Sequence, residues 1–177
     1  MILESMYQQA LWAQSDINEH CYTLRKLAEQ CNHVTEFGTR YGVSTVSLLS
    51  GFIRGKLRKL ISYDIESRWI VFALKELYPQ YFDFVQGSSL SIIIEKTDLL
   101  FIDTLHTEKQ LSRELLLHSG SVSKYIVIHD TEKFWISGEY NEPGLRFAVE
   151  RFLESNVFWK ISEIYHNNNG LMVLKHD

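Results

Sequence analysis

The sequence has little of what would cross-link a protein or anchor it in a membrane. Among its 177 residues are two cysteines and two prolines. Cys21 and Cys31 do not form a Cys-x-x-Cys pair, so they predict neither a metal site nor a disulfide scaffold. No apolar run approaches the roughly 20 residues that a membrane helix requires. Polar side chains interrupt residues 1–12, unlike a signal peptide. We therefore expect a soluble, cytoplasmic protein without a membrane partner.

An excess of positive charge is also missing. The 18 Lys and Arg residues against 22 Asp and Glu residues give a formal charge of −4 and a pI near 6.0. A protein that binds nucleic acid without sequence preference needs a basic surplus, so we expect no nucleic-acid partner. The hydrophobic share of 45% and the charged share of 23% are typical of a globular chain. The length predicts one domain over residues 1–177.

Short apolar runs alternate with helical patterns along most of the chain, which is typical of a parallel sheet covered by helices. The expected strands are residues 34–37, 60–63, 81–86, 98–102 and 125–128. The expected helices are residues 43–52, 67–77, 108–118 and 145–154, with an earlier one from a cap at Ser15-Asp16 to Ala28. Two last extended segments, 158–165 and 171–174, flank an Asn-Gly turn, which favours an antiparallel hairpin. Seven strands are thus expected in an α/β fold.

The end of the first strand carries an unusual glycine pattern. Residues 36–44 read Glu-Phe-Gly-Thr-Arg-Tyr-Gly-Val-Ser, in which Gly38 allows a sharp turn and Gly42 allows close approach to a ligand. The pattern matches neither a dinucleotide fingerprint nor a phosphate loop, and an ordinary strand-to-helix turn is the alternative. Asp64 ends the second strand, where a carboxylate can accept both hydroxyls of a ribose. An exposed strand-end aspartate is the alternative there.

In order along the chain, these segments resemble class I S-adenosylmethionine-dependent methyltransferases. The resemblance lies in Glu-x-Gly-x-x-x-Gly-x-Ser at 36–44, in Asp64, and in the final hairpin. Ile-Asp-Thr-Leu-His at 102–106 and His-Asp-Thr at 129–131 narrow it. Together with Asn-Gly-Leu at 169–171, they are similar to a small branch related to cephalosporin-hydroxylase-like and catechol-type O-methyltransferases.

The resemblance implies a Rossmann-like, seven-stranded, mostly parallel sheet with helices on both faces and a C-terminal antiparallel hairpin. It covers about residues 16–174. Residues 33–177 would form the core of the single methyltransferase domain. Residues 1–32 would form an N-terminal helical segment that could serve as a lid over the cofactor.

For the methionine part of the cofactor S-adenosylmethionine, the resemblance implies contacts from the first strand end. Gly38, Thr39 and Gly42 would pass under this part, with Glu36 near its amino group. Ser44 closes the same motif and is the fifth expected contact on this side.

For the nucleoside part, the resemblance implies contacts from later strand ends. Asp64 would hold the ribose, while Ser88 and Ser89 would lie beside the adenine. Many relatives carry an acidic residue beside the adenine, so the two serines depart from the pattern. Asp103, at the end of the most apolar strand, would face the reactive methyl group.

Four residues carry the chemistry that the resemblance implies for catalysis: Asp103, His106, His129 and Asp130. His106 stands where catechol-type relatives carry a lysine base, and an imidazole can take a proton near neutral pH. Alternatively, Asp103, His129 and Asp130 could hold a divalent metal that acidifies a substrate hydroxyl. The histidine makes magnesium a poorer fit than an all-oxygen set would. Simple hydrogen bonding that orders the loop is the third interpretation.

Substrate recognition is left to two segments. Phe134 and Trp135 follow the fifth strand, where an acceptor pocket is expected. Tyr7, Trp12 and residues 15–20 could form the lid. Packing of a loop onto the domain is the alternative for each group, and it is favoured for Trp12.

Three further side chains carry no predicted role in the reaction. Trp69 and Phe72 are expected in the core, and His20 on a helix surface. Because residues 33–177 are expected to form the core, little of the chain is left to build an acceptor pocket.

The leading hypothesis is methyl transfer from S-adenosylmethionine to a small polar acceptor, with a hydroxyl oxygen as the acceptor atom and a base or metal assisting. A noncatalytic cofactor-binding or partner module of the same fold is the alternative. A nucleic-acid methyltransferase is disfavoured by the acidic balance and by Ile-Asp-Thr-Leu at 102–105, where an Asn-Pro-Pro-Tyr-like motif would stand. The short chain predicts either a small, open acceptor site or a site completed by a second subunit of a homo-oligomer.

Overall fold

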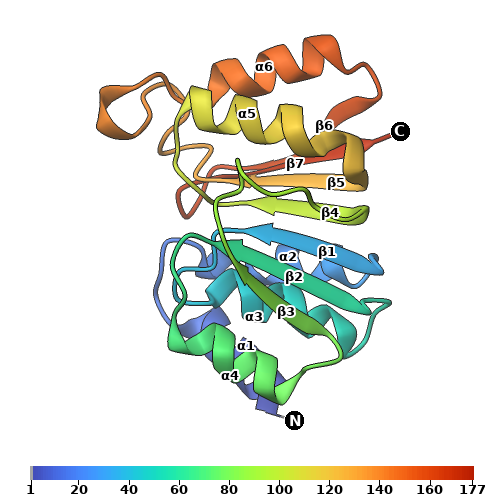
Figure 1. The fold of residues 1–177 in the computed structure, drawn as a ribbon. Helices are drawn as coiled ribbons and strands as arrows, with labels where there is room; N and C mark the ends of the chain where they lie inside the picture. The colour runs from blue at the N-terminus through green and yellow to red at the C-terminus, as the bar shows by residue number, and fades with distance from the viewer. Residues whose placement is uncertain (1) are drawn as a thin grey trace.

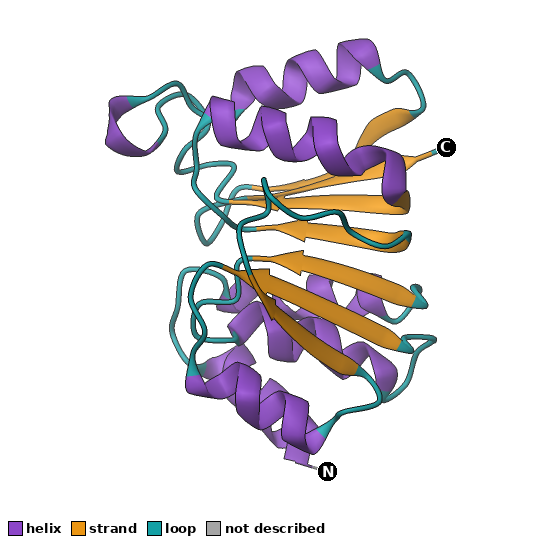
Figure 2. Cartoon of the chain, in the orientation of Figure 1, coloured by secondary structure: helices purple, strands orange, loops and turns teal. Residues whose placement is uncertain are grey.

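A single sheet of seven strands runs through the computed structural model, which describes residues 2–177 (Figures 1 and 2). The strands are β1 (His33–Phe37), β2 (Lys59–Asp64), β3 (Phe82–Gln86), β4 (Thr97–Ile102), β5 (Val122–His129), β6 (Trp159–Tyr165) and β7 (Leu171–His176). Their order is β3-β2-β1-β4-β5-β7-β6. β1 to β5 are parallel, and β7 is antiparallel to both of its neighbours. The predicted fold class is confirmed.

Helices cover both faces of this sheet. They are α1 (Ile2–Trp12), α2 (Cys21–Ala28), α3 (Val43–Leu49), α4 (Trp69–Leu77), α5 (Glu108–His118) and α6 (Arg146–Ser155). Side chains of β4 alternate between the two layers, because successive residues of a strand point to opposite faces. Leu99 and Phe101 join the core under α1 to α4, whereas Leu100 and Ile102 join the core under α5 and α6. None of the helices in residues 2–177 is long and apolar enough to cross a membrane.

The N-terminal segment begins with a helix ahead of the expected cap at Ser15-Asp16. α1 lies within the helical segment expected over residues 1–32, and it buries Leu3, Tyr7 and Ala10. These residues are four and three positions apart and so share one helix face, which the polar residues between them obscure in the sequence. Arg25 on α2 holds α1 with two hydrogen bonds to the Glu4 carboxylate, of 3.0 and 3.1 Å. Tyr7 is therefore a core residue and not part of a lid.

The predicted helix over residues 16–28 is also wrong at its start. Asp16 does not cap it, because the Asp16 carboxylate pairs with Arg40 at 2.6 Å. A 3-10 turn, η1 (Asn18–His20), precedes α2, and the His20 ring is buried instead of lying on a helix surface.

The hydrophobic face of α4 is not the one expected. Trp69 is 75% exposed and Phe72 is 59% exposed, so the prediction that both lie in the core is wrong. Ile70, Val71 and Leu74 are buried instead. The helix is apolar on more than one side, and helical spacing alone could not decide which side meets the sheet.

Two connections between strands contain no helix: the segment between β3 and β4 and the turn between β6 and β7. Residues 87–96 join β3 to β4 without a helix, and Ile94 from this segment fills the core below α5. The turn between β6 and β7 has left-handed backbone at Asn168, Asn169 and Gly170, as the Asn-Gly signal predicts.

Candidate functional site

The site lies at the carboxyl ends of three adjacent strands. Phe37 pairs with Ile102 across β1 and β4, and Ile102 pairs with Ile128 across β4 and β5. Because the strands are parallel, the residues that follow these positions reach the same edge of the sheet. Gly38 and Asp103 therefore meet there, and the Asp103 amide donates a hydrogen bond to the Phe37 carbonyl at 2.9 Å.

The loop after β1 is shaped by its two glycines. Gly38 has φ +87°, and a Cβ there would overlap the carbonyl oxygen of Asp103. Gly42 has φ +79°, and a Cβ there would lie 2.7 Å from a carbon of Ile70. Both positions need glycine, because other residues rarely adopt this backbone region and no space is left for a side chain.

Asp64 anchors this loop from the end of β2. Its Oδ2 accepts hydrogen bonds from the Thr39 amide at 2.7 Å, the Thr39 hydroxyl at 3.1 Å and the Arg40 amide at 3.1 Å. Burial would raise the pKa of Asp64, but hydrogen bonds from the amides of Glu66, Thr39 and Arg40 lower it. The carboxylate stays charged, and it holds the glycine loop to the end of β2.

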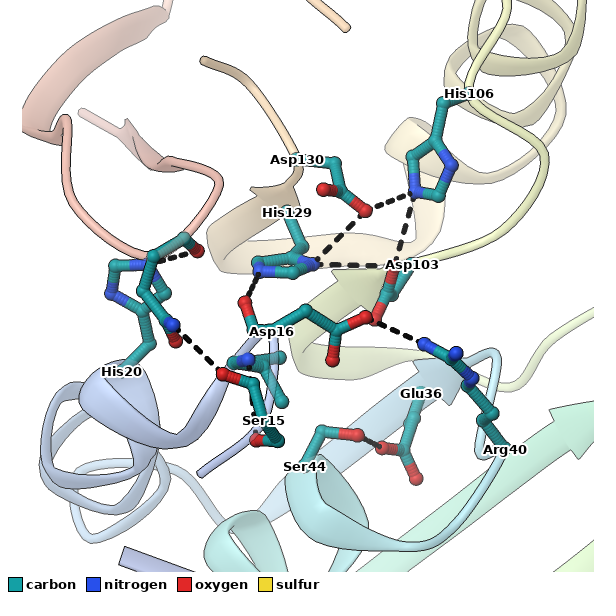
Figure 3. Close-up of polar contacts among 12 residues, drawn as sticks. Ser15, Asp16, His20, Glu36, Arg40, Ser44, Asp103, His106, His129 and Asp130 are labelled. Atoms are coloured by element: carbon teal, nitrogen blue, oxygen red, sulfur yellow. Dashed lines mark hydrogen bonds and ion pairs between the residues drawn. The ribbon is translucent and has the colours of Figure 1, made fainter. Parts of the chain in front are cut away.

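Glu36 lies behind the loop and not on its open side (Figure 3). Its carboxyl is completely buried and accepts hydrogen bonds from Ser44 at 2.6 Å and from Ser62 at 2.5 Å. Burial raises the pKa of Glu36 to about 7. Ser44 therefore links the Glu36 carboxyl to α3, the helix that follows the glycine loop.

A cavity of ≈ 330 Å³ lies between the glycine loop and the segment that leads into α2. It is lined by Gln14, Ser15, Asp16, Ile17, Gly38, Thr39, Arg40, Tyr41, Val43, Ser44 and Asp103. Four of the predicted cofactor residues, Gly38, Thr39, Ser44 and Asp103, therefore share one cavity. Glu36, Gly42, Asp64, Ser88 and Ser89 do not line it. A larger groove of ≈ 1190 Å³ runs along α5 and α6, and none of the nine predicted cofactor residues lines it.

The two serines after β3 are engaged by the protein itself. The Ser89 hydroxyl donates to Glu114 of α5 at 2.6 Å, and the Ser88 hydroxyl accepts from the Leu90 amide at 3.2 Å. Thr104, which follows β4, also donates to Glu114, at 2.8 Å. Burial raises the pKa of Glu114. This buried carboxyl, which the sequence did not reveal, ties the ends of β3 and β4 together.

The four residues predicted for catalysis, Asp103, His106, His129 and Asp130, form one charged cluster (Figure 3). His106 Nε2 lies 2.8 Å from Asp130 Oδ2 and 3.2 Å from Asp103 Oδ1. His129 Nδ1 lies 3.4 Å from an oxygen of each carboxylate. Burial would raise the pKa of Asp103, but its pairing with the two histidines lowers it to about 2. Burial would lower the pKa values of His106 and His129, but the two aspartates raise both to about 10.

The donors of this cluster fit a metal ion. His129 Nε2 lies 3.1 Å from the Asp16 carbonyl, which can only accept, so Nε2 carries a proton. His129 Nδ1 and Asp130 Oδ1 are buried without a hydrogen-bond partner among residues 2–177. One donor atom each from Asp103, His129 and Asp130 lie within 4.8 Å of one another. A metal-bound histidine commonly donates its other nitrogen to a backbone carbonyl, as His129 does here.

The segment over the cavity is fastened at several points. Arg40 pairs with Asp16 at 2.6 Å. The side-chain amide of Asn168, in the β6–β7 turn, donates to the Ser15 carbonyl at 2.9 Å. The Glu19 amide donates to the Asn168 side chain at 3.2 Å. Residues 14–17 line the cavity and form its cover, whereas Trp12 is exposed and does not line the cavity. Their action as a lid stays a prediction.

The loop after β5 adds two neighbours to His106. The Phe134 ring stacks on the imidazole at 4.8 Å between centroids and 11° between planes. Phe134 lines neither the cavity nor the groove described above, so its place in an acceptor pocket stays a prediction. Glu139 was not singled out in the sequence, yet its Oε1 lies 2.7 Å from His106 Nδ1. Its position in a loop with no regular spacing left no signal for it.

Solved structures with the same fold include several methyltransferases. An O-methyltransferase from Bacillus cereus, in complex with SAH, is 16% identical with a TM-score of 0.64, over 99% of this chain and 90% of that one. The O-methyltransferase TomG from Streptomyces achromogenes, in complex with SAM, is 17% identical with a TM-score of 0.67, over 98% and 89%. A Burkholderia thailandensis 1,6-didemethyltoxoflavin-N1-methyltransferase is 11% identical with a TM-score of 0.65, over 99% and 87%. These likenesses concern the fold.

None of the curated proteins matches the chain. The sequence family described as "Methyltransferase domain" matches residues 35–131, which include the glycine loop and all four residues of the charged cluster. The match covers more than half of the chain, and the sheet has the seven strands and final antiparallel hairpin expected of the class I fold. This chain therefore belongs to the methyltransferase-domain family, as its sequence motifs indicate.

Proposed function

We propose that the chain transfers a methyl group from S-adenosylmethionine to a hydroxyl oxygen of a small polar acceptor. One observation carries this proposal: Asp103 lines the cavity beside the glycine loop and also belongs to the buried His/Asp cluster. A cofactor seated in the cavity would thus lie next to groups that can manage a proton. Structural neighbours named as complexes with SAM or SAH support the choice of methyl donor.

The residues around the cavity would bind and orient the cofactor, which supplies an activated methyl group when bound. The backbone of Gly38 and Thr39 offers close approach, and Asp64 keeps this loop in place. Ser44 lines the wall with Glu36 behind it. Holding the two reactants in line accounts for most of the rate enhancement expected in methyl transfer.

The charged cluster would handle the proton of the acceptor. The two aspartates raise the pKa values of His106 and His129, which disfavours either imidazole as the proton acceptor, so we propose a carboxylate in place of the His106 base. Asp130 Oδ1 has no hydrogen-bond partner among the described residues. We propose that it accepts the hydrogen bond of the acceptor hydroxyl, whose proton becomes strongly acidic as the oxygen bonds to carbon.

Asp103, His129 and Asp130 would hold a divalent ion if the protein uses one. The ion would lower the pKa of an acceptor hydroxyl bound to it. One imidazole and two carboxylates suit a first-row transition metal better than magnesium. Titration with Mn²⁺, Zn²⁺ and Mg²⁺ by calorimetry, with His129→Gln as the comparison, tests this arrangement.

Calorimetry with S-adenosylhomocysteine tests the cofactor. We expect binding by the wild type and at least about tenfold weaker binding by Asp64→Asn, since that variant weakens the support of the glycine loop. Asp83→Asn is the matched control, because Asp83 lies near the amino end of β3 and pairs with Lys75 at the surface. Absence of binding heat from the wild type would overturn the proposed cofactor.

A noncatalytic cofactor-binding module is the second candidate. It is favoured by the charged cluster, whose members already neutralise one another, and by the Asp16–Arg40 pair that covers the cavity. Incubation with S-adenosylmethionine carrying a labelled methyl group and a panel of alcohols, phenols and amines separates the two. A methylated product removes the second candidate, and the amines test whether nitrogen is the acceptor atom.

The proposal also covers the domain organisation, the location and the partners of the protein. We propose one domain over residues 1–177, a cytoplasmic location, a small-molecule acceptor and no nucleic-acid partner, which the acidic balance supports. The acceptor site is either small and open or completed by a second subunit. Sedimentation measured with and without S-adenosylhomocysteine tests for a homo-oligomer, and a salt-dependent mobility shift with RNA would contradict the absence of a nucleic-acid partner.

A further inference from the structure

Glu139 and His106 are joined by three hydrogen bonds. Glu139 Oε1 accepts one from the His106 ring at Nδ1, at 2.7 Å, and one from the His106 backbone amide, at 3.1 Å. The Glu139 amide donates in return to the His106 carbonyl at 3.1 Å. Glu139 belongs to the 3-10 turn η4 (Glu139–Asn141) in the loop after β5, whereas His106 follows β4. Two loops that follow different strands are thus locked together at this pair.

The hydrogen bond between His106 Nδ1 and Glu139 determines which ring nitrogen faces Asp103 and Asp130. Because Nδ1 carries the proton donated to Glu139, the ring cannot flip without losing this bond. Nε2 is then directed to Asp130 at 2.8 Å and Asp103 at 3.2 Å. Stacking on Phe134 holds the plane of the ring from a third direction.

The loop around Glu139 is built to keep this position. A Cβ at Gly138 would overlap the His106 carbonyl, so glycine is needed for the close approach. Tyr140 and Asn141 have φ of +57° and +61°, a region that costs about 1 kcal/mol or more for residues other than glycine. The Glu108 amide also donates to the Pro143 carbonyl at 2.8 Å, which closes the loop onto the start of α5.

We propose that Glu139 is the positioning residue for His106: it fixes the ring so that Nε2 faces Asp103 and Asp130, and it makes this orientation depend on the docked loop of residues 131–144. The inference depends on the proposed function, since it gives the acceptor-side loop control over the cluster beside the cofactor. Glu139 does not touch the cavity. Its carboxylate is 31% exposed and would be hydrated if the loop undocked.

NMR of protein labelled with ¹⁵N at histidine tests the contact without any acceptor. We expect a wild-type signal for the His106 Nδ1 proton, assigned by its loss in His106→Asn. In Glu139→Gln this signal should move upfield, and its exchange with water should become at least about tenfold faster. Glu142→Gln is the matched control in the same loop, because the Glu142 side chain makes no hydrogen bond or ion pair with a described residue. An unchanged signal in Glu139→Gln would overturn the inference.

Activity gives a second readout once an acceptor is known. We expect Glu139→Gln to lower kcat by about 10- to 100-fold with little change in KM, and Glu139→Asp to recover part of the loss. Affinity for S-adenosylhomocysteine should stay at the wild-type value in both variants. An altered His106 signal in a protein that never binds S-adenosylhomocysteine would overturn the proposed function and leave the Glu139 contact in place. Binding together with an unchanged signal would overturn the inference alone.

Discussion

Glu36 shows that a residue can belong to a sequence motif and still lie outside the cavity that other residues of the motif line. The motif predicts Glu36 next to the cofactor, whereas the structure places its carboxyl beneath Ser44, which lines the cavity in its stead. Strand periodicity could not have shown this. Whether a side chain at a strand end reaches a cavity or stays in the core depends on the neighbouring strand, here on Ser62 of β2. The hydroxyls of Ser44 and Ser62 compensate Glu36 for the loss of water.

The raised pKa of Glu36 predicts a pH-dependent stability. Between pH 4.5 and about 7 the folded protein retains a proton on Glu36 that the unfolded chain has released, so the free energy of unfolding falls as the pH rises. Glu36→Gln lacks this effect. Relative to the wild type, we expect it to gain on the order of 3 kcal/mol between pH 4.5 and pH 7.5. Urea unfolding at both pH values measures the gain, and Glu154→Gln, an exposed position on α6, controls for removal of a charge. A constant difference between Glu36→Gln and the wild type would contradict the prediction.

At the scale of elements, the strands were predictable and the packing of helices was less so. Buried parallel strands such as β4 are nearly continuous apolar runs, which the sequence displays directly. For α1 and α4 the sequence could not say which side chains meet the sheet, because that depends on partners distant in the chain, such as Arg25 for Glu4. The grouping of Asp103, His106, His129 and Asp130 was predicted from the family resemblance, on residues that follow the ends of β4 and β5. Glu139 and Glu114 were not, since each reaches its partner from outside the strand ends.

The glycine loop after β1 leads to a prediction about Gly38. In Gly38→Ala the new methyl group would overlap the Asp103 carbonyl, and the backbone would stay in the left-handed region. We expect a loss of at least about 2 kcal/mol in the free energy of unfolding and a loss of S-adenosylhomocysteine binding. Gly120→Ala is the matched control, since a Cβ there meets no atom within 4 Å, and a change within about 0.5 kcal/mol is expected. Equal urea midpoints for the two variants would show that the loop tolerates a side chain.

At the scale of the whole molecule, the site is closed by segments from both ends of the described chain. The turn between β6 and β7 reaches back to residues 15–19 through Asn168, and the His20 ring packs edge-on against His129 at 5.8 Å between centroids. The cover of the cavity is therefore held by the sheet and not by α1 alone. We therefore expect a change that weakens the β6–β7 turn to destabilise the cover as well.

Asn168 provides the test of this coupling. Asn168→Ala removes hydrogen bonds to the Ser15 carbonyl and from the Glu19 amide, and it places alanine at φ +47°. Two lost hydrogen bonds correspond to about 2 kcal/mol, so amides in residues 14–20 should exchange about 10- to 30-fold faster with deuterated water. His166→Ala, at an exposed position of the same turn, should leave exchange in residues 14–20 unchanged. Equal exchange in the two variants would mean that the cover is independent of the hairpin.

The position of β7 has a consequence for how the protein is made. β7 (Leu171–His176) is the last strand in the sequence, but it lies between β5 and β6. During synthesis β6 therefore emerges before the strand that connects it to the rest of the sheet, and the Asn168 contact to the cover forms only when this hairpin closes. A nascent chain on the ribosome would present an open sheet edge at β5 and an unfinished cofactor site. We therefore expect methyl-donor binding to strengthen once residues 171–176 have been translated, because β7 closes the hairpin whose Asn168 side chain holds the cover.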